Sequence, residues 1–191
     1  RIGHGHSGIN PLDAGNVEQA AKLLENHPQE RSALLAAAHE RKKTMVLSLI
    51  QIIRGSSPSD REENVIEAAL TVLENTHANP VLADLLQVVR DAPEPVRMAA
   101  LDRGSLDRYK QVTEELEASL MALLNGRLGG IFASATTTPM MMDRSVVFDV
   151  HDMLHEHSDL QAAVLLASSS YGFATVEISQ TLADAGVAPR H

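Results

Sequence analysis

The sequence contains no cysteine and no tryptophan, and aromatic residues make up only 3% of its 191 residues. Without cysteine there is no disulfide framework, no thiolate metal site and no cysteine nucleophile, which fits a reducing compartment. So few aromatic side chains leave little surface on which single-stranded bases can stack. These absences argue against a disulfide-stapled secreted domain and against a stand-alone single-strand binding module.

Long apolar runs are also absent. No stretch approaches the roughly 20 residues that a transmembrane helix needs, and no leader with a charged and then an apolar part follows Arg1. A first residue other than methionine predicts a piece cut from a longer polypeptide. We therefore expect a cytoplasmic protein without a membrane-spanning segment, which reaches the inner face of the membrane only through partners.

Negative charge dominates the chain. The formal net charge is −9, and 44% of the residues are hydrophobic. Such a balance supplies enough apolar surface for one packed core, keeps a domain soluble and repels a phosphate backbone at long range. We therefore expect no DNA binding by this chain on its own.

Helical patterns fill residues 16–125. Ser59 and Glu62 form a capping-box sequence, and Asn79 before Pro80 predicts a cap and the first residue of a further helix. The predicted helices are Asn16–Asn26, Pro28–Arg54, Asp60–Asn75, Pro80–Val89, Val96–Leu101 and Leu106–Leu124.

Apolar residues recur in these helices at spacings of three and four residues, which is typical of a buried face. Leu23 and Leu35 belong to the faces that this spacing predicts to be buried. Convincing strand patterns are confined to the ends, near Ile2 and over 146–148. The predicted fold is mainly α, a helical bundle-like subdomain with a small β remnant formed by the segments at its two ends.

Two histidines, His151 and His155, are four residues apart, so a helix places both on one face. Imidazoles are common zinc ligands. The zinc-hydrolase pattern H-E-x-x-H has a glutamate between them, whereas Asp152, Met153 and Leu154 stand here. We keep His151 and His155 as candidate metal ligands, against a solvated junction of helix and loop.

Gly3, Gly5 and Gly8 match the letters of a G-x-G-x-x-G nucleotide loop. Asn10 and Pro11 break the chain where the helix of such a loop begins, so an ordinary loop is the better interpretation. No serine, histidine and acid arrangement has a catalytic motif around it. We assign no catalytic residue and no cofactor to this sequence itself.

Basic residues gather at Arg41, Lys42 and Lys43 within the predicted long helix. Such a cluster can contact phosphate groups or an acidic partner, although most clusters of this kind are the solvated face of a helix. We treat these three residues as candidate phosphate or partner contacts. Further basic residues follow at Arg97, Arg103, Arg108 and Lys110.

Three sets of landmarks occur in a fixed order along the chain. The first is Asn10-Pro11-Leu12-Asp13, preceded by Arg1-Ile2-Gly3. The second is Gly129-Gly130-Ile131-Phe132 followed by Thr136, and the third is Val147-Phe148-Asp149-Val150. A long helical stretch separates the first set from the other two.

In this order the chain resembles the segment that follows the nucleotide-binding loop in conjugative-transfer, or type IV secretion, ATPases of the FtsK/HerA-like P-loop superfamily. The resemblance implies a strand end and loop of a motor core in 1–15, an all-helical insertion in 16–125, and a return strand and helix of the core in 126–191. Asn10, Pro11, Leu12 and Asp13 would form the turn after the strand. The later motif residues are Gly129, Gly130, Phe132, Phe148 and Asp149.

The resemblance also implies that the residues that bind ATP and magnesium belong to other parts of the parent protein. The phosphate-binding lysine would lie before Arg1 and the acidic pair that holds magnesium would lie after His191, so ATP and magnesium are expected for the parent protein and not for this chain. Partners would be other subunits of a hexameric motor or the secretion apparatus, with DNA bound only through the parent. The helical insertion would be a regulatory or partner-docking element.

Two alternatives stay open. The chain can be an independent helical protein-interaction module whose turn motifs match by accident. It can also be a hydrolase whose metal is held by histidine and aspartate. A lysine-containing phosphate loop upstream and an acidic pair downstream in the reading frame would distinguish the motor from the independent module.

Overall fold

The computed structural model describes residues 10–12, 17–125 and 176–187. Helix accounts for 78% of these residues and no strand occurs among them, which confirms the predicted mainly α fold. The segments expected to form the β remnant lie outside the described residues. The labelled helices are α1 (Val17–Leu23), α2 (Pro28–Arg54), α3 (Asp60–Thr76), α4 (Leu82–Asp91), α5 (Glu94–Ala100) and α6 (Leu106–Asn125), and a further helix covers 176–184.

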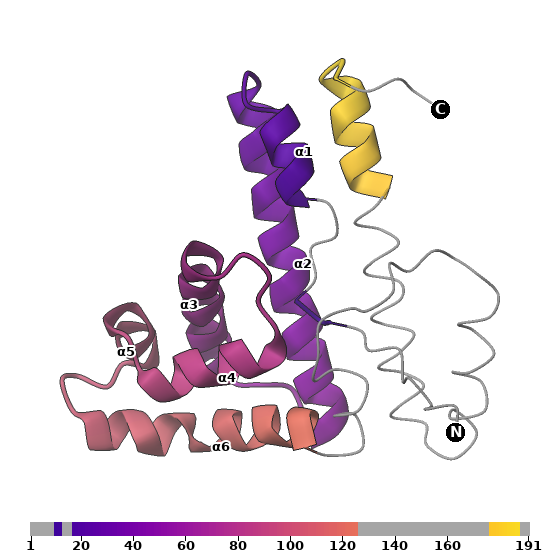
Figure 1. The fold of residues 1–191 in the computed structure, drawn as a ribbon. Coiled ribbons are helices and arrows are strands. Elements are labelled where there is room, and N and C mark those ends of the chain that lie inside the picture. Colours follow the sequence, from indigo (N-terminus) through magenta and orange to yellow (C-terminus); the bar gives the residue numbers. More distant parts are fainter. Residues whose placement is uncertain (1–9, 13–16, 126–175, 188–191) are drawn as a thin grey trace, which may run out of the picture.

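The longest helix, α2, runs beside both groups of described helices (Figure 1), and α1, α3 and α6 pack directly against it. At 1.5 Å per residue its 27 residues extend about 40 Å. Pro28 stands in its first turn, where a missing N–H costs nothing. Gly55 ends it in the left-handed region at φ 77°, where its N–H donates to the Gln51 carbonyl at 2.9 Å. Both ends are those that the sequence predicts.

The main core lies between the C-terminal half of α2 and the helices α3 to α6. In Figure 1 these four helices gather against one end of α2, on the side opposite the helix over 176–184. Leu12 joins this core with 1% of its surface exposed, although it belongs to the segment before α1. The largest side chains that are fully buried here are Leu49, Ile50, Ile66, Leu70, Leu73, Leu82, Leu85 and Leu116.

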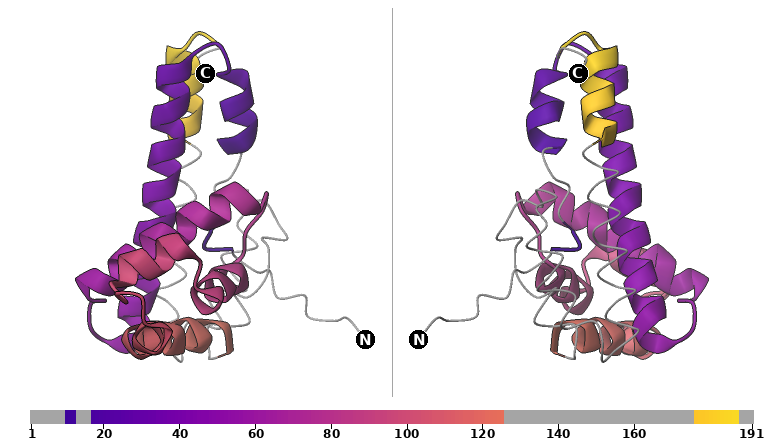
Figure 2. Two further views of the ribbon diagram at one scale, coloured as in Figure 1. Left: turned by 90° about the vertical axis from the view of Figure 1, so that its left-hand side faces the viewer. Right: turned by 90° about the vertical axis from the view of Figure 1, so that its right-hand side faces the viewer.

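A second, smaller core surrounds the N-terminal half of α2. Both views of Figure 2 place α1 and the helix over 176–184 beside this half of α2. After the helix over 176–184, Gly186 adopts φ 70°, and the N–H of Val187 donates to the Leu182 carbonyl at 3.0 Å. The buried residues of this core are Val17, Ala20, Leu24, Leu34, Ala38 and Ile178.

The start of α4 differs from the sequence prediction. The helix begins at Leu82 after Val81, not at Pro80 after an Asn79 cap. The Asp84 carboxylate accepts a hydrogen bond from the Val81 N–H at 2.9 Å and so satisfies this helix end from within the first turn. The Pro80 carbonyl is meanwhile used by Asn10, a partner far away in the sequence.

Two residues predicted to be buried are exposed. Leu23 is 57% exposed and Leu35 is 42% exposed. Both lie in the smaller core region. Among the described residues, α1 and the start of α2 have few neighbouring helices there, so fewer positions on each helix are buried than the sequence period implies. None of the helices in the described residues is long and apolar enough to cross a membrane.

Candidate functional site

Charged residues near the middle of α2 connect it to two other elements. We call His39, Arg41, Lys42 and Lys43 the α2 charged cluster. Residues three and four apart share a helix face, whereas residues two apart point in different directions. His39, Lys42 and Lys43 therefore face α3, and Arg41 points away from it. The α3 carboxylates opposite them are Glu63, Glu67 and Glu74.

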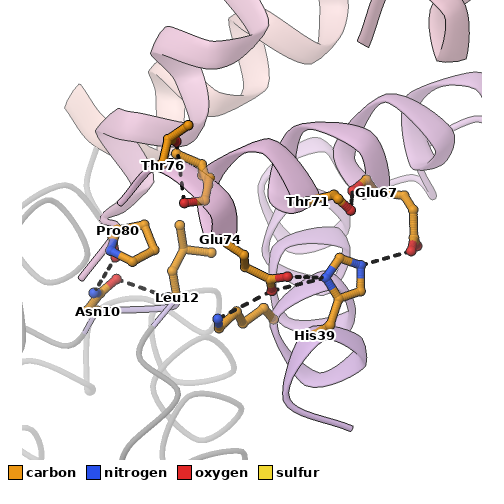
Figure 3. A network of polar contacts seen from close by, with 10 residues as sticks. Asn10, Leu12, His39, Glu67, Thr71, Glu74, Thr76 and Pro80 are labelled. Carbon is orange, nitrogen blue, oxygen red and sulfur yellow. Dashed lines mark hydrogen bonds and ion pairs between the residues drawn. The ribbon is translucent and has the colours of Figure 1, made fainter. Parts of the chain in front are cut away.

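His39 is held between two carboxylates of α3 (Figure 3). Its Nε2 lies 2.8 Å from Glu67 Oε1, and its Nδ1 lies 3.0 Å from both carboxylate oxygens of Glu74. An ionised carboxylate only accepts hydrogen bonds, and a neutral imidazole has a single N–H to donate. Two such bonds at once require both ring nitrogens to be protonated. The arrangement therefore selects the imidazolium form.

The pKa of His39 follows from two opposing effects. Burial of the ring in the contact between α2 and α3 lowers the pKa, because it penalises the charged form. The hydrogen bonds from Glu74 and Glu67, together with their negative charges, raise it by more. The net result is a pKa above the ordinary 6.5. The two carboxylates thus favour the charged form of His39.

Lys42 and Lys43 complete the contact with α3. Lys43 Nζ lies 2.7 Å from Glu67 and 3.4 Å from Glu63, and Lys42 Nζ lies 3.4 Å from Glu74. The hydrogen bond between Lys43 and Glu67 raises the pKa of the lysine and lowers that of the carboxyl group. Three basic side chains and three carboxylates therefore form one continuous network between the two helices.

Arg41 connects α2 to the C-terminal segment. Its Nη1 forms an ion pair and hydrogen bond with the Glu177 carboxylate in the helix over 176–184. The other terminal nitrogen, Nη2, is buried without a hydrogen-bond partner among the described residues. One arginine thus ties the middle of α2 to a segment 136 residues further along the chain.

The segment before α1 is tied to the helical region at a second place (Figure 3). Asn10 is 8% exposed, and its side-chain Nδ2 donates to the Pro80 carbonyl at 2.8 Å. Its Oδ1 accepts from the Leu12 N–H at 3.0 Å, which closes a tight turn. The turn directs Leu12 into the main core. Asn10, Pro11 and Leu12 are all buried.

The residues of this site connect segments that are far apart in the sequence. Two short stretches, 10–12 and 176–187, lie before and after residues 17–125 in the sequence, and both are anchored on the helices of that region. Arg41, Lys42 and Lys43 each have a carboxylate partner within the chain. A phosphate group would have to displace these carboxylates, so the proposed phosphate contact stays a prediction.

Several candidate residues fall outside the described residues. Among the residues that the structure describes, no group of three or more histidine, aspartate or glutamate side chains is placed to hold a metal ion. The candidate metal ligands and the remaining motif residues stay predictions, and they are Asp13, Gly129, Gly130, Phe132, Phe148, Asp149, His151 and His155.

Neither His39 nor its carboxylate partners were predicted from the sequence as site residues. A signal was present, since Glu63, Glu67 and Glu74 are four and seven residues apart and share one face of α3. His39, Lys42 and Lys43 form a basic row with the matching spacing on α2. Two rows of opposite charge on consecutive helices favour a salt-bridged contact.

The chain was compared with protein families, curated proteins and solved structures. No protein family, no curated protein and no solved structure matches this chain. Its function is therefore inferred from the site and from the sequence landmarks.

Proposed function

We propose that this chain is the helical subdomain of an ATP-driven DNA or protein translocase of conjugation or type IV secretion, and that it acts as a regulatory or partner-docking element without catalysing a reaction itself. One observation carries the proposal. Segments on both sides of residues 17–125 are anchored on the helices of that region, one through Asn10 and Leu12 and the other through Arg41. An insertion in a motor core needs such anchors where the chain leaves the core and where it returns.

The arrangement of α2 supports a regulatory role. Arg41 holds the helix over 176–184, while His39 and Lys43, on another face of the same helix, hold α3. A continuous helix moves as a stiff body, so a displacement of 176–184 reaches α3 through α2. In this proposal 176–187 belongs to the motor core, and α2 passes its movement to the helical region.

ATP and magnesium belong to the parent protein in this proposal. None of the described residues is assigned to either of them. Other subunits of a hexameric motor or the secretion apparatus would be the partners, DNA would be bound only through the parent, and the protein would work in the cytoplasm.

A second candidate function is an independent helical protein-interaction module. The observation that favours it is the composition of the main core: of its buried side chains among the described residues, all except Leu12 come from residues 17–125. A region that buries its own apolar surface can fold without a motor core around it.

The reading frame that encodes the chain distinguishes the two functions. We expect a G-x-x-x-x-G-K-[ST] loop upstream of Arg1 and an acidic pair after a strand downstream of His191. A complete reading frame with neither feature would favour the independent module.

The regulatory role has its own test in the parent protein. We expect Arg41→Glu and Glu177→Arg each to change the ATP hydrolysis rate, because each breaks the ion pair between α2 and 176–184. Combining the two restores the pair in the opposite direction and should restore the rate. Equal rates for the parent and both single variants would contradict the role. Glu25→Arg, an exposed change after α1, serves as the control.

A further inference from the structure

The connection between α5 and α6 concentrates exposed apolar side chains. Within the described part of the chain, Met98 is 68% exposed, Leu101 52% and Leu106 46%, all inside nine consecutive residues. Single exposed apolar residues are ordinary, whereas a local group of them marks an interaction surface. The other large exposed hydrophobic residues in the described ranges are dispersed, at Leu23, Leu35, Met121 and Val176.

Leu101 is held in a conformation that disfavours leucine. Its φ is 57°, in the left-handed region, where glycine is the usual residue at the end of a helix. A bulky side chain in the left-handed region lowers the stability of the fold. The exposed half of the Leu101 side chain contributes no burial in the core that would offset this loss. Ala92 and Arg103 have the same conformation, so Leu101 differs from them in holding a large apolar side chain half-exposed at a helix end.

The connection holds these side chains in a fixed geometry. The N–H of Leu101 donates to the Met98 carbonyl at 3.1 Å, and the N–H of Asp102 donates to the Arg97 carbonyl at 3.4 Å. Arg97 Nε donates to Asp102 Oδ2 at 2.5 Å, and the N–H of Gly104 donates to Asp102 Oδ1 at 2.9 Å. A prefolded loop loses little conformational entropy when it binds a partner.

Basic residues lie close to the apolar group in the sequence. Arg103, Arg108 and Lys110 are exposed, and none of them makes an ion pair among the described residues. Asp107 is the exposed carboxylate among them, because Asp102 is buried against Arg97. Residues 97–110 therefore hold four basic and two acidic side chains in a chain whose net charge is −9, and exposed Glu94 precedes them. Figure 1 shows α5 and the start of α6 at the edge of the helical region, away from α2.

We propose that residues 97–110, the α5–α6 corner, dock an acidic amphipathic segment of a partner protein. The apolar side chains of that segment would cover Met98, Leu101 and Leu106, and its carboxylates would meet the unpaired cations. The proposal deepens the partner-docking role proposed above, although the corner would serve an independent interaction module equally well.

A protein segment suits this surface better than a nucleic acid. Bases need aromatic faces to stack on, and Tyr109, the aromatic residue of the corner, is 2% exposed. Leucine and methionine side chains instead match the apolar face of a helix. Charge complementarity then selects carboxylates as the polar rim of that helix.

The test uses a library of random displayed peptides, selected for binding to the full 191-residue chain. We expect the enriched peptides to combine leucine-type residues with aspartate and glutamate. Leu101→Gly should weaken their binding by at least about tenfold, since central apolar anchors carry most of the affinity of an interface. Arg108→Glu should weaken it through charge repulsion. Leu23→Ser, a change at a similarly exposed leucine of α1, should leave binding unchanged.

Leu101→Gly also separates binding from folding. Glycine adopts φ 57° without strain, and this gain offsets the lost burial of the half-covered side chain and the larger entropy of the unfolded chain, so the variant should melt close to the parent chain. A loss of peptide binding then reports the missing side chain, and Arg108→Glu, at an exposed position, provides a second variant that should keep the fold.

Three outcomes would overturn the proposal. They are the absence of enrichment, enriched peptides without acidic residues, and binding that Leu101→Gly leaves intact. A labelled oligonucleotide that binds the chain and is released by Arg108→Glu but not by Leu101→Gly would assign the corner to phosphate groups instead. If peptides bind as expected while the reading frame lacks the motor motifs, the docking surface stands and the translocase assignment fails.

Discussion

Arg54 at the end of α2 and Glu62 in the first turn of α3 form a two-point ion pair, with Nη1 2.9 Å from Oε1 and Nη2 2.7 Å from Oε2. Arg54 Nη2 also donates to Ser119 Oγ at 2.9 Å, and Glu62 Oε1 accepts from the Ser59 N–H at 3.1 Å. The pair therefore joins α2, α3 and α6 and completes the capping box of α3. Glu62 is 6% exposed, so the pair is part of the interior.

We expect Glu62→Gln to lower the free energy of unfolding by about 3 kcal/mol, because it leaves the Arg54 charge largely buried without its counter-ion. Chemical denaturation of the 191-residue chain measures this loss. Glu63→Gln is the matched control, since that neighbouring side chain makes only a partly exposed ion pair with Lys43 and should cost about 1 kcal/mol or less. Equal losses for the two variants would contradict the structural role of the pair between Arg54 and Glu62.

Acid should weaken the same pair. Burial raises the pKa of Glu62, but the hydrogen bonds and charge of Arg54 and the Ser59 N–H lower it by more, to below the ordinary 4.5. A carboxyl group with a lowered pKa stabilises the fold above its unfolded pKa, and this contribution disappears as the pH falls through the folded pKa. We expect the stability difference between the parent and Glu62→Gln to shrink below pH 4.5. A constant difference down to acid unfolding would contradict the lowered pKa.

The contribution of His39 to stability should change with pH in the opposite direction to that of Glu62. The pKa of His39 is raised above 6.5, so its contribution is fully present below pH 6.5 and is lost as the pH rises through the folded pKa. We expect His39→Gln to destabilise the chain more at pH 6 than at pH 9. Denaturation at both pH values measures this, and the ring protons of His39 in an NMR titration report the pKa itself.

The control for His39 is His27→Gln, because His27 makes no ion pair among the described residues. A His39 pKa at or below 6.5, or a loss in His39→Gln that grows with pH, would show that the ring does not donate to Glu67 and Glu74 at once.

Asn10→Ala should detach the segment before α1. The change removes the hydrogen bond to the Pro80 carbonyl and the acceptor of the Leu12 N–H, which together should cost about 1–3 kcal/mol. Hydrogen exchange at the Leu12 amide should become faster than in the parent chain. Gln19→Ala, an exposed change on α1, serves as the control. Unchanged exchange at Leu12 would show that Asn10 does not anchor this segment.

Tyr109 gives a spectroscopic test of the main core. Its hydroxyl donates to the Val89 carbonyl at 2.5 Å, and burial together with the charge of Glu117 raises its pKa to about 12. We expect an ultraviolet titration to show a tyrosine ionising near that pH, and Tyr109→Phe to abolish this transition. The variant should also lose about 1 kcal/mol of stability with the hydrogen bond. A Tyr109 that ionises near pH 10 would mean that the ring is not buried.

The sequence predicts helices well where the signal is local. Pro28 and Gly55 mark the two ends of α2, and Ser59 with Glu62 marks the start of α3, because the residues that fix these ends lie within one turn of them. The start of α4 is not predicted correctly from local signals. Pro80 contributes its carbonyl to Asn10, a partner 70 residues away, and no local pattern records that bond.

The candidate site was less accessible from the sequence. The cluster of Arg41, Lys42 and Lys43 is visible, but its partners depend on which faces of α2 meet α3 and the helix over 176–184. That choice is made by tertiary packing. The role of His39 is not predicted for the same reason, because its carboxylate partners lie 28 and 35 residues away in the sequence.

The division between this chain and its parent is tested most directly by calorimetry with magnesium and ATP. We expect no saturable heat for the 191-residue chain, because the phosphate-binding lysine and the magnesium carboxylates are expected outside it. The product of the complete reading frame should bind ATP in the same experiment. Saturable binding of ATP by the 191-residue chain at micromolar concentration, or no binding by the complete product, would contradict the proposal that this chain is the helical, non-catalytic part of an ATP-driven translocase.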